Sequence, residues 1–107
     1  MALPLEGVRV LDLTSVMAGP YCTMVLGDMG AEVIKIENFP EGDASRRFDP
    51  KINDESYCFA VLNRNKKSIG LNMKDARGKD EVQELTKKYE AKVEELIEKK
   101  RNEILQV

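Results

Sequence analysis

The 107-residue chain contains no histidine and no tryptophan. Without an imidazole group it has no histidine metal ligand, no histidine general base and no Ser-His-Asp triad. Cysteine is scarce as well, because only Cys22 and Cys58 occur and their spacing matches no zinc motif. We therefore expect reduced thiols and a cytoplasmic protein.

Long hydrophobic runs and a surplus of positive charge are also missing. The apolar runs are far shorter than the roughly 18–20 residues that cross a membrane. The opening residues MALPLEGVRV lack the basic and apolar segments of a signal peptide. Lys and Arg total 17 against 19 Asp and Glu, a net charge of -2. We therefore expect neither a membrane nor a nucleic-acid partner.

Composition changes along the chain. Residues 1–80 contain every glycine and proline, whereas residues 81–107 contain neither and consist mainly of helix formers. The length fits a single domain over 1–107. We expect an α/β segment over 1–80, followed by a long helix over 81–107.

The first forty residues predict a βαβ unit. Val8–Leu13 is a branched apolar run, typical of a buried strand. Gly19-Pro20 indicates a helix start with proline in the first helical position, and Gly30 is placed to end that helix. A second strand is expected over Glu32–Glu37. Two strands joined by a helix imply parallel pairing with a right-handed crossover.

The middle of the chain completes the predicted sheet. Residues 38–53 have the composition of a loop, and Asp54 is placed to cap a short helix over 55–62. Ser68–Asn72 predicts a third strand. The expected fold class is α/β, a small Rossmann-like βαβ unit with a three-stranded parallel sheet and one long C-terminal amphipathic helix.

The final helix is predicted to follow Asp75 as its cap. Its apolar residues recur in steps of three, four and seven, which places them on one stripe. The stripe is longer than a three-stranded layer can cover, so we expect a homodimer in which the long helices pack together or on the partner's sheet. The stripe residues are Val82, Leu85, Tyr89, Val93, Leu96, Ile97, Ile104 and Leu105.

The first candidate site is the loop Thr14–Pro20, between the first strand and the first helix. Open α/β sheets bind ligands at this edge, where free backbone N–H groups and the helix dipole attract anions. The loop matches neither GxGxxG nor a Walker A motif. On spacing alone, a simple turn explains it as well as a ligand loop does.

Charged residues give two weaker candidates. A basic set could meet phosphate, but composition favours a solvated surface balanced by acids as its explanation. Among the acids, Asp12 stands out near the end of an apolar strand, where a carboxylate bonded to backbone N–H groups is the plainer explanation. Both cysteines are expected to be buried and inert. The basic set is Arg46, Arg47, Arg64, Lys66, Lys67, Lys74 and Arg77, and the other acids are Asp28, Glu37, Asp43 and Asp49.

The first 80 residues contain three blocks, PLEGVRVLDLTSVMAGPYCTMVLGDMGAEVIKIE, GDASRRF and LNRNKKSIGLNMKDARGK. In their sequence, order and spacing these blocks closely resemble the class III CoA-transferases. The resemblance implies a Rossmann-like CoA-binding domain, a cofactor role for coenzyme A, and transfer of CoA between carboxylic acids in the intact family.

The resemblance also implies binding residues. The loop Val16, Met17 and Ala18 corresponds to the family's contact with the CoA thioester. Leu71 and Lys74 correspond to contacts with the adenine and its phosphates. Where the family often has an arginine after its second strand, this chain has Asn38, so one phosphate contact is expected to be lost.

No catalytic residue is expected within the chain. The family's nucleophilic aspartate lies downstream of the matched blocks, so the resemblance implies a segment that binds CoA weakly and does not catalyse transfer. The last residues, DEVQELTKKYEAKVEELIEKKRNEILQV, resemble the C-terminal helix of ribosome recycling factor. That second resemblance leaves two alternatives, a structural or designed chimera without a ligand and a ribosome-associated helical module.

Overall fold

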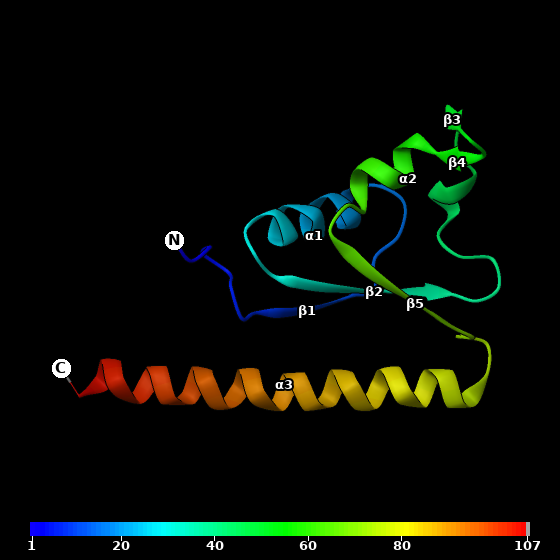
Figure 1. The fold of residues 1–107 in the computed structure, drawn as a ribbon. Helices are drawn as coiled ribbons and strands as arrows, with labels where there is room; N and C mark the ends of the chain where they lie inside the picture. The colour runs from blue at the N-terminus through cyan, green and yellow to red at the C-terminus, as the bar shows by residue number, and fades with distance from the viewer. Residues whose placement is uncertain (107) are drawn as a thin grey trace. The chain divides into compact units, whose positions relative to one another are not determined.

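The structure, a computed structural model, describes residues 1–106 and divides the chain into two units. The first unit, Met1–Asn72, holds the five strands of the described residues (Figure 1). The second unit begins at Met73 and consists mainly of one long helix. The compositional change near residue 80 therefore lies inside this helix and not at its start.

The central sheet confirms the predicted α/β fold. Its three strands are β1 (Arg9–Asp12), β2 (Glu32–Asn38) and β5 (Lys66–Leu71), in the order β1-β2-β5. Both pairings are parallel. The third strand begins two residues before the predicted Ser68. Since the strands are parallel, the loops that follow them meet at one edge of the sheet.

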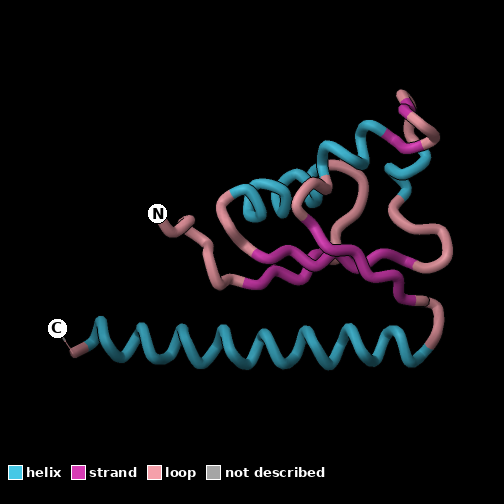
Figure 2. The backbone as a smooth tube through the Cα atoms, in the orientation of Figure 1, coloured by secondary structure: helices cyan, strands magenta, loops and turns pink. Residues whose placement is uncertain are grey.

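One face of this sheet is covered by helix α1 (Ala18–Asp28), as Figure 2 shows. The alternation of β2 directs Val33, Lys35 and Glu37 toward that covered face. All three are buried, so the covered face is apolar at one end and charged at the other. The buried apolar residues of the first unit are Met24, Ala31, Val33 and Ile36.

Gly30 ends α1 as the sequence predicts. It has a φ of 104°, a conformation that favours glycine. Its N–H donates to the Gly27 carbonyl at 3.0 Å, and the Ala31 N–H donates to the Leu26 carbonyl at 3.1 Å. These two bonds form a Schellman motif, which satisfies the last carbonyls of the helix and turns the chain into β2.

The predicted start of α1 is wrong by two residues. The helix begins at Ala18, so Pro20 occupies its third position and not its first. Proline is accommodated there because the first four N–H groups of a helix have no intrahelical acceptor.

The segment predicted as a loop contains regular structure. A 3-10 helix, η1, covers Ala44–Arg47, and β3 (Lys51–Ile52) pairs with β4 (Glu55–Ser56) in an antiparallel hairpin. Asn53 and Asp54 form its turn, both with positive φ. Asp54 is therefore not a helix cap, and the prediction for it was wrong.

Ser56 caps the short helix instead. Helix α2 spans Tyr57–Leu62, and the Ser56 hydroxyl accepts a hydrogen bond from the Phe59 N–H at 3.4 Å. Two-residue strands are too short for the sequence pattern to predict. The hairpin was therefore missed, and the cap was predicted two residues before its observed position.

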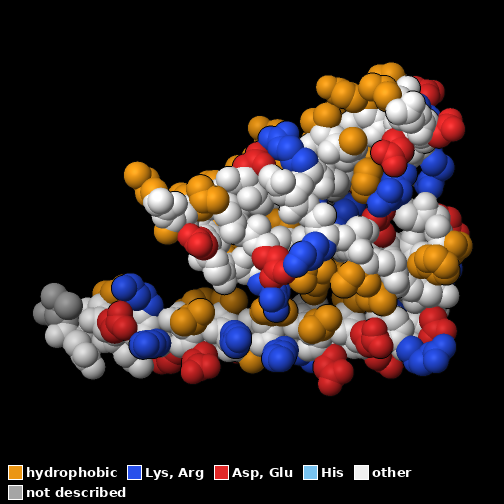
Figure 3. All heavy atoms as spheres, in the orientation of Figure 1, with side chains coloured by type: hydrophobic (Ala, Val, Ile, Leu, Met, Phe, Trp, Pro, Cys, Tyr) orange, Lys and Arg blue, Asp and Glu red, His pale blue; other side chains and the backbone are white. Residues whose placement is uncertain are grey.

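The second unit is the helix α3 (Ala76–Leu105), which at 1.5 Å per residue is about 45 Å long. The Asp75 carboxylate accepts from the Arg77 N–H at 2.9 Å, so the predicted cap is confirmed. Charges of both signs lie along this helix in Figure 3. Of the helices in residues 1–106, none combines the length and hydrophobicity that crossing a lipid bilayer requires.

Replacing Gly30 tests the end of α1. A Cβ at Gly30 would lie 2.6 Å from the Leu3 Cβ, in addition to the cost of positive φ. We expect Gly30→Ala to lower the free energy of unfolding by about 1–3 kcal/mol, measured by urea denaturation. Gly27→Ala is the matched control, because its Cβ would meet Val33 Cγ2 at an ordinary 3.5 Å. Equal effects of the two substitutions would contradict this role of Gly30.

Candidate functional site

The loop between β1 and α1 lies at the carboxyl edge of the sheet, where the sequence predicts the site. Val16 has a φ of 69°, in the left-handed region, although its side chain is β-branched. Met17 is the N-cap residue of α1, and its side chain is 56% exposed. Ala18, also exposed, begins the helix. The three predicted residues thus form a continuous turn, in which Val16 is half-buried and Met17 and Ala18 are exposed.

The N-terminus of α1 has no side-chain cap within the described residues. Pro20 lacks an N–H group, so the donors of the first turn are backbone amides that precede it. Gly19 brings this turn against the loop, because a Cβ there would lie only 2.3 Å from the Thr14 Cβ. An uncapped helix N-terminus of this kind favours a negatively charged ligand group.

Two buried ion pairs lie beneath the loop. The first joins Lys66 Nζ to Asp12 Oδ2 at 3.0 Å, with both side chains at most 2% exposed. Asp12 also accepts hydrogen bonds from the Thr14 N–H and the hydroxyls of Thr14 and Thr23. The plainer explanation of Asp12, a carboxylate bonded to backbone N–H groups, holds for the Thr14 N–H alone, because its other partners are hydroxyls and an ammonium group. Lys66 Nζ also donates hydrogen bonds to the Pro20 carbonyl and to the Asn63 side-chain oxygen.

The second pair joins Lys35 Nζ to Asp43 Oδ2 at 2.8 Å, with both side chains 1% exposed. Lys35 also donates to the Thr14 carbonyl at 2.9 Å. Asp43 accepts from the Val16 N–H at 3.1 Å and from the N–H and hydroxyl of Ser45. Lys35 comes from β2 and Asp43 from the loop after it, and through Thr14 and Val16 this pair joins both of them to the loop between β1 and α1.

The surroundings keep the buried carboxylates charged. Burial alone would raise the pKa of Asp43, but hydrogen bonds from Lys35, Ser45 and Val16 outweigh it and lower that pKa to about 2. For Asp12 burial acts in the same direction, and hydrogen bonds from Thr14 and Thr23 bring its pKa below the ordinary value. Burial lowers the pKa of Lys66, against the attraction of Asp12.

A third charged group extends the network toward α2. The Arg46 guanidinium donates two hydrogen bonds of 2.7 Å to the Glu37 carboxylate. Glu37 also accepts from the Asp43 N–H and the Ser68 hydroxyl. Chiefly because of the Arg46 hydrogen bonds, the pKa of Glu37 falls to about 2.

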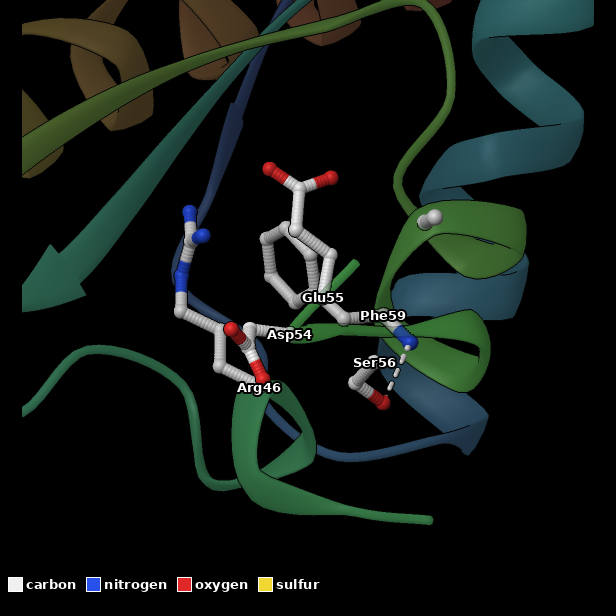
Figure 4. Close-up of a pocket in the computed structure, with 6 residues that line it drawn as sticks. Arg46, Asp54, Glu55, Ser56 and Phe59 are labelled. Carbon is white, nitrogen blue, oxygen red and sulfur yellow. Dashed lines mark hydrogen bonds between the residues drawn. The ribbon is translucent and has the colours of Figure 1, made fainter. Parts of the chain in front are cut away.

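Arg46 also contributes to a small pocket. Its guanidinium carbon lies 3.8 Å from the centre of the Phe59 ring, a cation–π contact. Figure 4 shows Arg46 and Phe59 beside Glu55, Asp54 and Ser56 around this pocket. Its volume is about 280 Å³. Sequence reasoning missed it, because its residues come from η1, the β3–β4 hairpin and α2.

The remaining predicted contacts lie farther along the chain. Leu71 is the last residue of β5 and is half-buried, and its carbonyl accepts from the Phe39 N–H at 2.9 Å. It therefore ends at the same sheet edge as Val16. Lys74 is exposed and belongs to the second unit. Asn38, at the position where the resembling family often has an arginine, ends β2 and donates to the Glu41 carboxylate at 3.3 Å.

Most of the predicted basic set is paired with acids, and its exposed members fit the explanation of a solvated surface balanced by acids. Exposed pairs join Arg64 to Asp28 at 2.6 Å and Lys67 to Glu32 at 2.7 Å. Lys66 differs from that explanation because its side chain is buried. The set therefore does not form one solvated face.

The prediction of two buried cysteines was wrong. Cys22 is exposed and Cys58 is half-buried, and both are free thiols. The buried residues of α1 are Pro20, Thr23 and Met24, so Cys22 falls on the opposite side of the helix. Within residues 1–106, no three His, Cys, Asp or Glu side chains are grouped so that they could hold a metal ion.

Comparison with known proteins gives consistent matches. The sequence profile of CoA-transferase family III matches residues 5–104. Succinyl-CoA:glutarate CoA-transferase of Mus musculus is 52% identical over 102 residues, which cover 94% of this chain and 23% of that protein. Formyl-CoA:oxalate CoA-transferase of Escherichia coli is 44% identical over 95 residues, which cover 88% of this chain and 23% of that protein.

Solved structures also match this chain in fold. A hypothetical protein of Mycobacterium tuberculosis has a TM-score of 0.68 and 42% identity over 78% of this chain and 23% of its own. A CAIB/BAIF family protein of Brucella suis has a TM-score of 0.68 at 34% identity, over 77% of this chain and 23% of its own. The chain thus spans less than a quarter of these relatives. The profile match includes most of α3, and the resemblance of that helix to ribosome recycling factor stays a prediction.

Two adjacent lysines provide a test of the Asp12 ion pair. Lys66→Met leaves the buried Asp12 charge without its cation, so we expect a loss of about 3 kcal/mol in unfolding free energy. Lys67→Met removes an exposed ion pair with Glu32, and we expect a loss below about 1 kcal/mol. Urea denaturation of both variants measures the difference, and similar losses would contradict it.

The low pKa of Glu37 predicts an acid-sensitive fold. Because the folded-state pKa is depressed, the charged form stabilises the fold above about pH 4.5, and this contribution is lost as the pH falls toward 2. We expect Glu37→Gln to be about 2 kcal/mol less stable at pH 7 and to lose less stability on acidification. Urea denaturation at pH 7 and pH 3 measures both effects.

The matched control for that experiment is Glu6→Gln, which changes an exposed carboxyl group. This variant should lose stability in parallel with the unmodified chain. If Glu37→Gln lost as much unfolding free energy between pH 7 and pH 3 as the unmodified chain, the Glu37 carboxylate would not be the source of the acid sensitivity.

Proposed function

Because the chain belongs to CoA-transferase family III, we propose that it is a coenzyme A-binding segment of such an enzyme. The turn of Val16, Met17 and Ala18 carries the proposal. It is open, it lies at the carboxyl edge of a parallel sheet, and it leads into a helix without a side-chain cap. In this proposal the turn contacts the thioester end of CoA, and Leu71 and Lys74 contact its adenine and phosphates.

The chemistry of the proposed contacts differs along the ligand. An exposed ammonium group such as that of Lys74 follows a multiply charged phosphate without fixed geometry. Backbone N–H groups at the start of α1 suit an oxygen with partial negative charge, such as a thioester carbonyl. A flexible, exposed Met17 adapts to the apolar part of the ligand.

We propose further that this segment binds without catalysing transfer. Group transfer between carboxylic acids through a covalent intermediate needs a carboxylate nucleophile that is open to the thioester. Asp12, Glu37 and Asp43 are buried and hydrogen bonded, and each has a lowered pKa. Such carboxylates are weak nucleophiles. In this proposal the transfer reaction named for the relatives uses residues outside the segment.

The apolar stripe of α3 supports a proposed homodimer. Val93, Leu96 and Ile97 are 53–65% exposed, and Ile104 and Leu105 are 64% and 72% exposed. A helix with such a stripe is stabilised when another apolar surface covers it. Sedimentation at tens of micromolar chain measures this, and a monomer at that concentration would contradict the dimer.

Titration of coenzyme A by calorimetry tests the proposed function. We expect saturable binding that Lys74→Ala weakens by about three- to tenfold, because one charge-assisted phosphate contact is removed. Lys92→Ala, an exposed lysine of α3, is the matched control and should bind like the unmodified chain.

Two outcomes would contradict the proposal. Absence of binding at millimolar CoA would mean that the family fold is present without its ligand, as in the alternative of a structural chimera. Binding that both lysine substitutions weaken equally would mean that general positive charge and not Lys74 attracts the phosphates.

A further inference from the structure

Val16 has a backbone conformation that its own sequence does not favour. Its φ of 69° lies in the left-handed region, where a β-branched side chain is an outlier. Thr14, Ser15 and Met17 offer no local reason for that conformation. Strain of this kind persists only where the surrounding structure enforces it, and it concentrates at functional sites.

The Lys35–Asp43 pair contacts the backbone at this point of the loop. Both oxygens of the Asp43 carboxylate lie within reach of the Val16 N–H, at 3.1 and 3.3 Å. The ammonium of Lys35 binds the Thr14 carbonyl at 2.9 Å. The pair thus contacts the backbone on both sides of Ser15, one donor to Thr14 and one acceptor for Val16.

Stability alone does not explain this pair. Removing two charges from water costs several kcal/mol, and apolar residues of similar volume are often as stabilising as a buried ion pair. A buried ion pair does supply a fixed direction for hydrogen bonds, which apolar packing does not. Here these hydrogen bonds join the pair to the backbone of Thr14 and Val16. The next residues of the loop, Met17 and Ala18, are exposed.

We propose that Lys35 and Asp43 are positioning residues for the coenzyme A site, because they hold Val16 in the left-handed conformation that presents Met17 and Ala18 to the ligand. Neither side chain touches the ligand, since both are 1% exposed. The inference rests on the proposed function for its ligand, but the hold on Val16 is testable without any ligand.

The first arm of the test measures CoA affinity. Asp43→Asn keeps the shape of the side chain but removes its charge, so we expect the dissociation constant for CoA to rise at least about tenfold. Adding Val16→Gly should bring the dissociation constant to within about threefold of that of Val16→Gly alone, because glycine adopts positive φ without a Cβ penalty. Val16→Gly alone supplies the reference affinity, because it removes the same side chain from the turn and leaves Asp43 intact.

Rescue separates positioning from general support of the fold. If Asp43 acted only on stability, Val16→Gly would not restore the affinity, and that result would overturn the proposal. Should Asp43→Asn fail to fold because Lys35 is left buried and charged, the pair Lys35→Met with Asp43→Asn removes that charge. The same loss and the same rescue by Val16→Gly are expected in this background.

The second arm needs no ligand. In the NMR spectrum of the unliganded chain, the Val16 amide proton should be shifted downfield and slow to exchange, because it donates to a carboxylate. Asp43→Asn should move it upfield and speed its exchange. An unchanged Val16 amide in that variant would overturn the proposal.

The two arms distinguish the failure of the inference from that of the proposed function. If the unmodified chain binds no CoA, the proposed function fails, and the Val16 amide alone decides whether the pair holds the loop. If CoA binds but the Val16 amide and the affinity are both unchanged in Asp43→Asn, the function stands and the positioning role is overturned.

Discussion

The structure depends on two lysine ammonium groups buried beneath the carboxyl edge of its sheet. Lys35 and Lys66 reach that edge from β2 and β5, with side chains at most 2% exposed. A buried ammonium group needs a carboxylate and further acceptors, because its desolvation is otherwise too costly. Asp43 and Asp12 supply the carboxylates, and the Thr14 and Pro20 carbonyls accept from the same two groups. The conformation of the loop follows from this requirement.

The same network connects the loop to the rest of the first unit. Glu37 accepts from the Asp43 N–H and pairs with Arg46, whose guanidinium lies over the Phe59 ring. Strand, 3-10 helix and α2 are therefore joined through charged groups where a larger domain would use an apolar core. A unit of about seventy residues buries few apolar side chains, so its polar contacts decide more of its geometry.

The sequence predicted the parts of the fold that depend on local patterns. The apolar runs, Gly30 and Asp75 indicated the parallel sheet, the end of α1 and the cap of α3, and all three are confirmed. The Lys35–Asp43 pair was not predicted, because its function arises from contacts between segments far apart in sequence. One signal was available, since lysine stands in the middle of the buried strand EVIKIE, on the same face as Val33. Cys22 was wrongly predicted to be buried, because its neighbours in the sequence are apolar although its side chain is exposed in the fold.

A backbone amide NMR titration of the chain with coenzyme A tests the proposed site most directly. If the buried lysines organise a CoA site, the shift changes will concentrate at Thr14–Gly19 and at Leu71–Lys74, with saturation at a common CoA concentration. Changes confined to the pocket of Arg46 and Phe59, or no changes at millimolar CoA, would contradict the claim that the buried lysines organise a nucleotide site at this edge of the sheet.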